Sequence, residues 1–265
     1  MKLTREGMLV ALGVASLALC APAIAGSAPS HAGPPVLVAQ ATSAPLLAGT
    51  PEPTQEPTTP ASDALVAAAA VGPEWNAFAQ QVVAANDYIE IVHSKQSRDG
   101  LVFDKTFKFW SRKPNYARCE IIDGDGKGGV VVWHGGTKVQ AHEGGEHSAI
   151  VVVLPRHNRN LVDLMGYGCG DVSPDNILGY TTHNGKLSEA PGPTIDGQAT
   201  DDVTWIVNPG DAIYLTRTEF YISKTSHLII ATHSFHGDTP VEDSTWQITM
   251  NPGVKFSTFD INTNL

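Results

Sequence analysis

The stretch that decides the fold is residues 88–122, which read YIEIVHSKQSRDGLVFDKTFKFWSRKPNYARCEII. Apolar and polar side chains alternate through it with a period of two, which is typical of β-strands. The alternation is interrupted at Arg98-Asp99-Gly100, a sequence suited to a tight turn. Because so short a turn can join only antiparallel neighbours, these residues predict the start of a meander of hairpins.

Outward from this stretch, helical periods appear twice among the strands. Pro73 opens an amphipathic pattern that predicts one helix before the first strand. Between Asn158 and Leu187 the helical spacing returns and predicts two short helices, followed by a Gly/Pro-rich loop. The further strands are expected at 130–134, 138–142, 149–154, 202–207, 212–223, 227–235 and 244–251. The fold class is therefore α+β and mostly β.

Three of these strands are apolar on both faces, namely Val130–Trp133, Ile150–Val153 and Leu228–Ala231. An antiparallel sheet with one wet face should instead alternate. Something must therefore cover each face. Helices can cover one side, and the other side is either a second sheet layer or the interior of a curled sheet.

The 265 residues divide into three segments of unlike composition. Residues 1–25 combine a basic start, an apolar run and an A-x-A site ending at Ala25, the pattern of a secretory signal, with an uncleaved anchor as the alternative. Residues 26–72 hold eight prolines and no Lys or Arg, which predicts a disordered linker. Residues 73–265 are expected to form one domain, periplasmic or secreted.

The three cysteines have different expected fates. Cys20 is not expected to carry a lipid, because Leu19 stands where a lipid-attachment site needs a small residue. Cys119 and Cys169 would meet an oxidising compartment after export, so a disulfide between them is the default expectation. Two separate free thiols are the alternative, since sequence does not supply the geometry of a bridge.

Charge and motifs exclude several classes of function. A net charge of −10 argues against a nucleic-acid binder. The string HEGGEH at 142–147 places its histidines five apart rather than the four that a zinc protease needs, and DGDGK at 123–127 lacks the closing Glu of a calcium loop. We therefore expect no metal, no cofactor and no catalytic residues.

The domain resembles the superfamily of the periplasmic lipoprotein carrier LolA and outer-membrane lipoprotein-sorting proteins, and more narrowly a bacterial family of unknown function within it. The resemblance spans nearly all of residues 73–265, and the Gly-rich run from Tyr167 to Gly170 departs from it. It is carried by YIEIVHSKQSRDGLVFDKTFKFWSRKPNYARCEI, GKGGVVVWHGGTKVQAHEGG, YLTRTEFYISKTSHLIIATHSF and WQITMNPGVKFSTFDIN.

The resemblance implies an open, curved antiparallel sheet forming a half barrel, closed on one side by helices, around an apolar cavity for acyl chains. Phe103, Phe107 and Phe109 share strand parity, as do Val131 and Trp133, and these five are the candidate lining residues. The alternative for each of them is an ordinary core residue.

The resulting hypothesis is a non-enzymatic envelope protein that binds or transfers a lipid, a lipoprotein acyl chain or another hydrophobic ligand. The alternative is a structural or interaction module of the envelope with a filled core, whose partner is another envelope protein. Folds host unrelated functions, so the resemblance alone does not decide between them.

Overall fold

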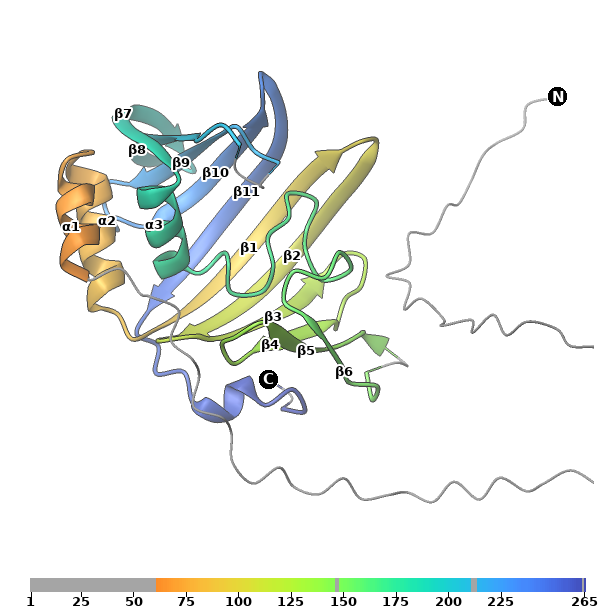
Figure 1. Cartoon of the computed structure of the whole chain (residues 1–265). Coiled ribbons are helices and arrows are strands. Elements are labelled where there is room, and N and C mark those ends of the chain that lie inside the picture. Colours follow the sequence, from red (N-terminus) through yellow and green to blue (C-terminus); the bar gives the residue numbers. More distant parts are fainter. Residues whose placement is uncertain (1–60, 146–147, 211–213, 264) are drawn as a thin grey trace, which may run out of the picture. The chain divides into compact units, whose positions relative to one another are not determined.

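The computed structural model describes residues 61–145, 148–210, 214–263 and 265. The expected signal segment and residues 26–60 of the expected linker lie outside the described residues. Within them, eleven strands form one antiparallel sheet that curves around one of its faces, with β6 and β7 at its edges (Figure 1). The predicted class, α+β with an open curved antiparallel sheet, is confirmed.

The strand order is β6-β5-β4-β3-β2-β1-β11-β10-β9-β8-β7. Two meanders therefore run outward from the centre, and the pairing of β1 with β11 joins them. The bounds are β1 Asp87–Arg98, β2 Leu101–Arg112, β3 Tyr116–Asp123, β4 Val130–Trp133, β5 Lys138–His142, β6 Val152–Pro155, β7 Gly185–Ile195, β8 Gln198–Val207, β9 Arg217–Ser223, β10 Ile229–His236 and β11 Thr239–Met250.

The predicted hairpin between β1 and β2 has the expected turn. Asp99 and Gly100 both adopt positive φ values, 52° and 80°. Two consecutive positive φ values are what a type I′ turn requires, and its twist matches that of the flanking strands. Pairing then extends from Arg98 opposite Leu101 to Asp87 opposite Arg112, which fixes the face of every side chain on both strands.

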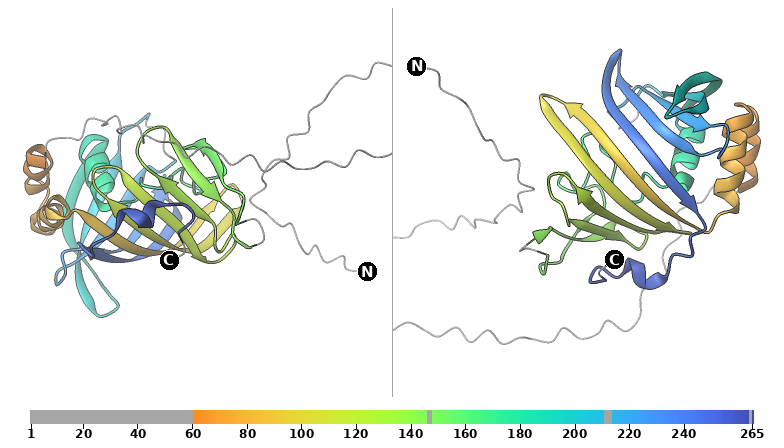
Figure 2. Two further views of the ribbon diagram at one scale, coloured as in Figure 1. Left: turned by 90° about the horizontal axis from the view of Figure 1, so that it is seen from below. Right: turned by 180° about the vertical axis from the view of Figure 1, so that it is seen from behind.

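Three helices pack on the face around which the sheet curves, here called the inner face: α1 (Ala61–Ala69), α2 (Pro73–Ala84) and α3 (Pro174–His183) (Figures 1 and 2). The helix predicted from Pro73 is α2, whose Trp75 and Phe78 are fully buried. Its first backbone amides donate to the Glu189 carboxylate on β7. α1 falls within the expected linker, yet its Ala64 and Ala68 are buried, so those residues belong to the packed domain.

Two predicted elements differ from the structure. Of the two short helices expected between Asn158 and Leu187, only α3 forms in the described chain, because Gly166 and Gly170 take positive φ values that break a helical period. The expected Gly/Pro-rich loop is instead strand β7, an edge strand, where prolines are tolerated because one side of the strand needs no hydrogen-bond donors.

The second cover of the sheet is neither a sheet layer nor a barrel interior. The C-terminal residues after β11, including a 3-10 helix at Phe256–Phe259, pack on the outer face. Val254, Phe259 and Ile261 bury Trp110 of β2 together with Val130 and Val132 of β4. This explains why β4 is apolar on both faces.

Candidate ligand-binding site

Strand register places the five predicted lining residues on the inner face. Phe107 pairs with Val92 and Phe109 with Glu90, and both partners belong to the inward set of β1. The ring centroids of Phe103 and Phe107 lie 5.7 Å apart, and those of Phe107 and Phe109 5.6 Å apart. The three rings therefore form a continuous aromatic row along β2.

Val131 and Trp133 continue the inner face across β3 and β4. Cys119 on β3 pairs with both Phe109 and Val131, so these three side chains share one face. The five residues differ in exposure, since Phe109 is 7% and Trp133 3% exposed. Phe103, Phe107 and Val131 are half-buried. The structure thus brings the five predicted residues to one face of the sheet.

The chain between β6 and α3, residues 156–173, crosses this inner face and is here called the crossing segment (Figure 1). Gly170 lies so close to Trp133 that an added Cβ would be 2.7 Å from the indole ring. The Arg156 guanidinium stacks 3.8 Å over the same ring. The crossing segment therefore fills the β4 end of the inner face.

The structure corrects the disulfide expectation, because Cys119 and Cys169 are both free. The Cys169 thiol is directed at the backbone, where it donates to the Val131 carbonyl at 3.6 Å. Both side chains belong to the contact between the crossing segment and the inner face. Burial raises the pKa of both thiols, which makes them poor nucleophiles.

A polar cluster near the β1–β2 turn anchors the crossing segment. The Gln96 amide donates to Asp163 Oδ2 at 2.8 Å and to Glu242 Oε1 at 3.2 Å, and Gln96 Oε1 accepts from the Leu164 amide at 3.0 Å. Burial, together with the nearby Glu242 carboxylate, raises the pKa of Asp163 to about 7. Ser94, Ser234 and Ser244 donate further hydrogen bonds to Glu242.

Deeper on the same face, Glu90 is fully buried between β2 and β11. Its Oε1 accepts a long bond of 3.5 Å from Ser111, while Oε2 has no partner among the described residues. Burial raises the pKa of Glu90 well above its ordinary value. Burial therefore favours the neutral form of this carboxyl group.

Sequence reasoning missed Asp163, Gln96, Glu242 and one further inner-face residue, Lys105. The signal for Lys105 was present in the sequence, because Lys105 shares strand parity with Phe103 and Phe107 and is the one charged residue between them on that face. Asp163 carried no such signal. Its partners lie on strands more than sixty residues away, and no local period reports that contact.

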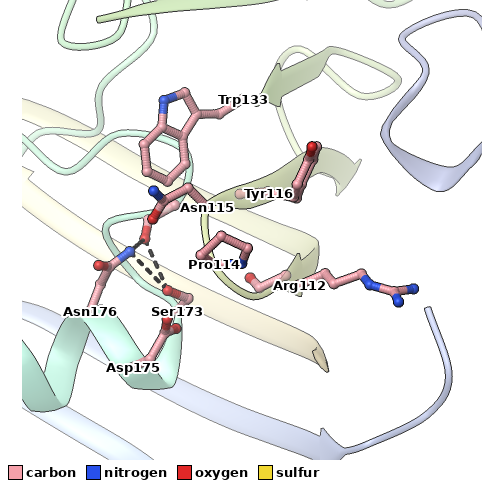
Figure 3. A pocket seen from close by; sticks show the side chains of 11 residues that line it. Arg112, Pro114, Asn115, Tyr116, Trp133, Ser173, Asp175 and Asn176 are labelled. Carbon is pink, nitrogen blue, oxygen red and sulfur yellow. Dashed lines mark hydrogen bonds between the residues drawn. The ribbon is translucent and has the colours of Figure 1, made fainter. Parts of the chain in front are cut away.

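A pocket of about 210 Å³, part of it open to solvent, lies at the β2–β3 turn (Figure 3). Asn115, Trp133, Asp175 and Asn176 line it, and the Asn176 amide donates to Ser173 Oγ at 3.0 Å. Its volume is below the range of small-molecule sites and its lining is largely polar. It is not a site for an acyl chain.

Histidine–carboxylate pairs occur mainly on the outer face or in loops. His93 lies 3.5 Å from Asp104 and His233 3.3 Å from Asp243, and all four residues point outward by strand register. Among the described residues no three His, Cys, Asp or Glu side chains are grouped to hold a metal ion. In the same residues no helix is long and apolar enough to cross a membrane.

The fold is thus an open, curved antiparallel sheet with helices and a crossing segment on its inner face. No protein-family model matches the chain, and no curated protein matches it either. Solved structures do. A DUF1329 family protein of Desulfovibrio piger is 13% identical with a TM-score of 0.42, covering 77% of this chain and 98% of its own.

Two further similar structures are named as a LolA superfamily protein and as a lipoprotein. A LolA superfamily protein of Nitrosomonas europaea is 9% identical with a TM-score of 0.33, covering 76% of this chain and 97% of its own. The Mycobacterium tuberculosis lipoprotein LppX is 14% identical with a TM-score of 0.40, covering 68% and 96%. These three structures are proteins to which the chain is similar, and one of them bears the superfamily name of the sequence resemblance. At these identities the similarity concerns the fold and says nothing about a ligand.

Proposed function

We propose that this is an exported envelope protein that binds a hydrophobic ligand, such as a lipid or a lipoprotein acyl chain, on the inner face of its sheet. The observation that carries the proposal is the aromatic row Phe103–Phe107–Phe109 on the inner face. Two of its three side chains, Phe103 and Phe107, are only half-buried although they lie inside the curve of the sheet. Phe103 and Phe107 keep part of their surface accessible to solvent, and this accessible apolar surface is what the proposal assigns to the ligand.

The energetics favour a chain-like ligand. Each methylene that leaves water contributes about 0.8 kcal/mol, so a long acyl chain gains enough to leave an aqueous compartment. The ligand would lie along the half-buried rings of Phe103 and Phe107 rather than near Trp133, because the crossing segment covers Trp133. The second part of the proposal is that the protein transfers the bound ligand to an acceptor. That the protein is exported rests on the signal pattern at its N-terminus.

The test is ligand capture by the purified protein. Native mass spectrometry and solvent extraction should recover a co-purifying lipid, and a fluorescent fatty acid should bind the emptied protein. Phe107→Ala should weaken probe binding about tenfold. Phe256→Ala is the matched control, because Phe256 is 58% exposed and lies on the outer face. Absence of both a lipid and probe uptake would refute the proposal.

A second function is favoured by the crossing segment itself. Met165 and Cys169 are buried against the inner face, so part of the expected cavity is already a filled core. This arrangement fits a structural or interaction module whose partner is an envelope protein. A pull-down that yields one stoichiometric protein partner, with no lipid in the complex, would support this module over the ligand carrier.

A further inference from the structure

Lys105 is a buried lysine in the middle of the aromatic row. It lies on β2 between Phe103 and Phe107, with its side chain on the inner face, and is 8% exposed. Its ammonium nitrogen lies 4.2 Å from the centroid of the Phe103 ring. A cation over an aromatic face is attracted by the ring, which holds the ammonium in place beside the half-buried phenylalanines.

The ammonium has no hydrogen-bond or ion-pair partner among the described residues, which sets it apart from other cations near the inner face. Lys113 donates to the Val82 carbonyl at 2.7 Å, and Arg98 donates to the Leu164 carbonyl at 3.0 Å. Asp125 acts on Lys105 only from beyond ion-pair distance, and burial lowers the pKa of the ammonium. A desolvated cation without a counter-charge is costly to maintain.

The groups next to Lys105 do not supply the hydrogen-bond partner or counter-charge that its ammonium lacks. Ser94, directly across on β1, is already bonded to Glu242 and Ser244. The Lys105 nitrogen is not among the fully enclosed, unpaired polar atoms, so it is reachable from outside. The inner face therefore presents one accessible, unpaired donor with a positive charge, flanked on both sides along the strand by aromatic rings.

Resting on the proposed function, we infer that the ligand is an anionic amphiphile whose acidic head group, a carboxylate or a phosphate, pairs with Lys105 and whose chain lies along Phe107 toward Phe109. From Lys105 to Phe109 the strand rises roughly 13 Å, a path that suits an acyl chain. A charge-assisted hydrogen bond to the head group would supply the missing partner.

The experiment compares ligands that share a chain and differ in the head group. Binding of oleate, 1-oleoyl-lysophosphatidate and methyl oleate is measured with wild-type protein, Lys105→Met and Lys108→Met. Lys108 is the matched control because it lies on the same strand with its ammonium over Trp110 on the outer face. Lys105→Met should weaken at least one anionic ligand about tenfold and leave methyl oleate within twofold, and Lys108→Met should change neither.

The outcomes separate the two proposals. Loss of oleate binding alone assigns the site to a carboxylate, and loss of lysophosphatidate alone assigns it to a phosphate. If Lys105→Met binds all three ligands as tightly as the wild type does, the inference about Lys105 is wrong. It is also wrong if Lys105→Met loses affinity for all three ligands equally and a Lys105→Arg variant, which keeps the positive charge, does not restore the preference for anionic ligands. If wild-type protein binds none of the three, the proposed function itself fails. Thermal melting of each variant verifies that it is folded.

Discussion

At the scale of single residues, burial favours the protonated form of two carboxyl groups on the inner face. Glu90 is enclosed without a partner for one oxygen, and Asp163 shares the Gln96 amide with Glu242. Water would stabilise the charged form of each acid, and burial removes that water. The stability of the domain should therefore depend on pH through these groups.

Asp163→Asn should reduce that pH dependence. A raised pKa in the folded state gives stability that is present below the unfolded pKa, near 4, and is lost as pH rises through about 7. We expect the wild type to lose about 2–3 kcal/mol more unfolding free energy than Asp163→Asn between pH 5 and pH 8. Urea unfolding at each pH measures the difference. Parallel pH profiles would show that Asp163 is ionised in the folded protein.

The two thiols should be protected and unbridged. Iodoacetamide applied to the native protein should leave Cys119 and Cys169 unmodified, because Cys169 is buried, Cys119 is half-buried, and burial raises the pKa of both thiols. In denaturant without reductant both should become alkylated, as mass spectrometry of peptides can establish. Failure of both to react until a reductant is added would instead restore the disulfide expected from export.

At the scale of elements, local sequence patterns predicted most of what is local. Alternation and turn chemistry gave β1 to β5, and Pro73 marked α2. The predictions that were wrong concern elements whose structure depends on contacts with residues far away in the sequence. The crossing segment has helical spacing at Leu161 and Leu164, but Trp133 and Gln96 hold it in an irregular path. In the same way, Pro191 and Pro193 are compatible with β7 only because β7 is an edge.

Two glycines allow a controlled test of how tightly the crossing segment is packed. Gly166 and Gly170 have φ values of 99° and 93°, so alanine is strained at either position. Only at Gly170 would the new Cβ meet Trp133. Gly166→Ala should cost about 1–2 kcal/mol of unfolding free energy. Gly170→Ala should cost a further 1–3 kcal/mol, roughly, from overpacking. If the two variants lose equal unfolding free energy in urea titrations, the Trp133 side chain moves away from the new Cβ at no cost.

At the scale of the whole described domain, one sheet is covered by two unrelated parts of the chain. Helices and the crossing segment cover the inner face, and the residues after β11 cover the outer face of β2 to β4. The second cover also accepts hydrogen bonds from Arg118, whose Nη1 donates to the Thr258 and Asp260 carbonyls at 3.4 and 3.1 Å. The C-terminal sequence has no hydrophobic period that predicts this cover, because the covering segment is irregular in structure.

Removal of residues 252–265 should therefore unfold or nearly unfold the domain. Burial of Val254, Phe259 and Ile261 contributes about 1.5–3 kcal/mol each, a sum comparable with the whole stability of a domain. The truncated protein should bind an apolar dye strongly and lose its cooperative urea transition. Truncation after Ile261 is the control and should change stability by less than about 1 kcal/mol. A cooperative, dye-free core in the shorter protein would contradict this account.

The central pairing of β1 with β11 sets the order in which the sheet can be completed. It places Tyr88 opposite Met250, so the middle of the sheet joins the first strand to the last. The hairpins from β1 to β6 contain only near neighbours and can pair as soon as they are synthesised. The seam between the two meanders must wait for almost the entire chain. Until that seam closes, β1 and β11 each present an unpaired edge, and we expect the newly made chain to be most prone to aggregation in that interval.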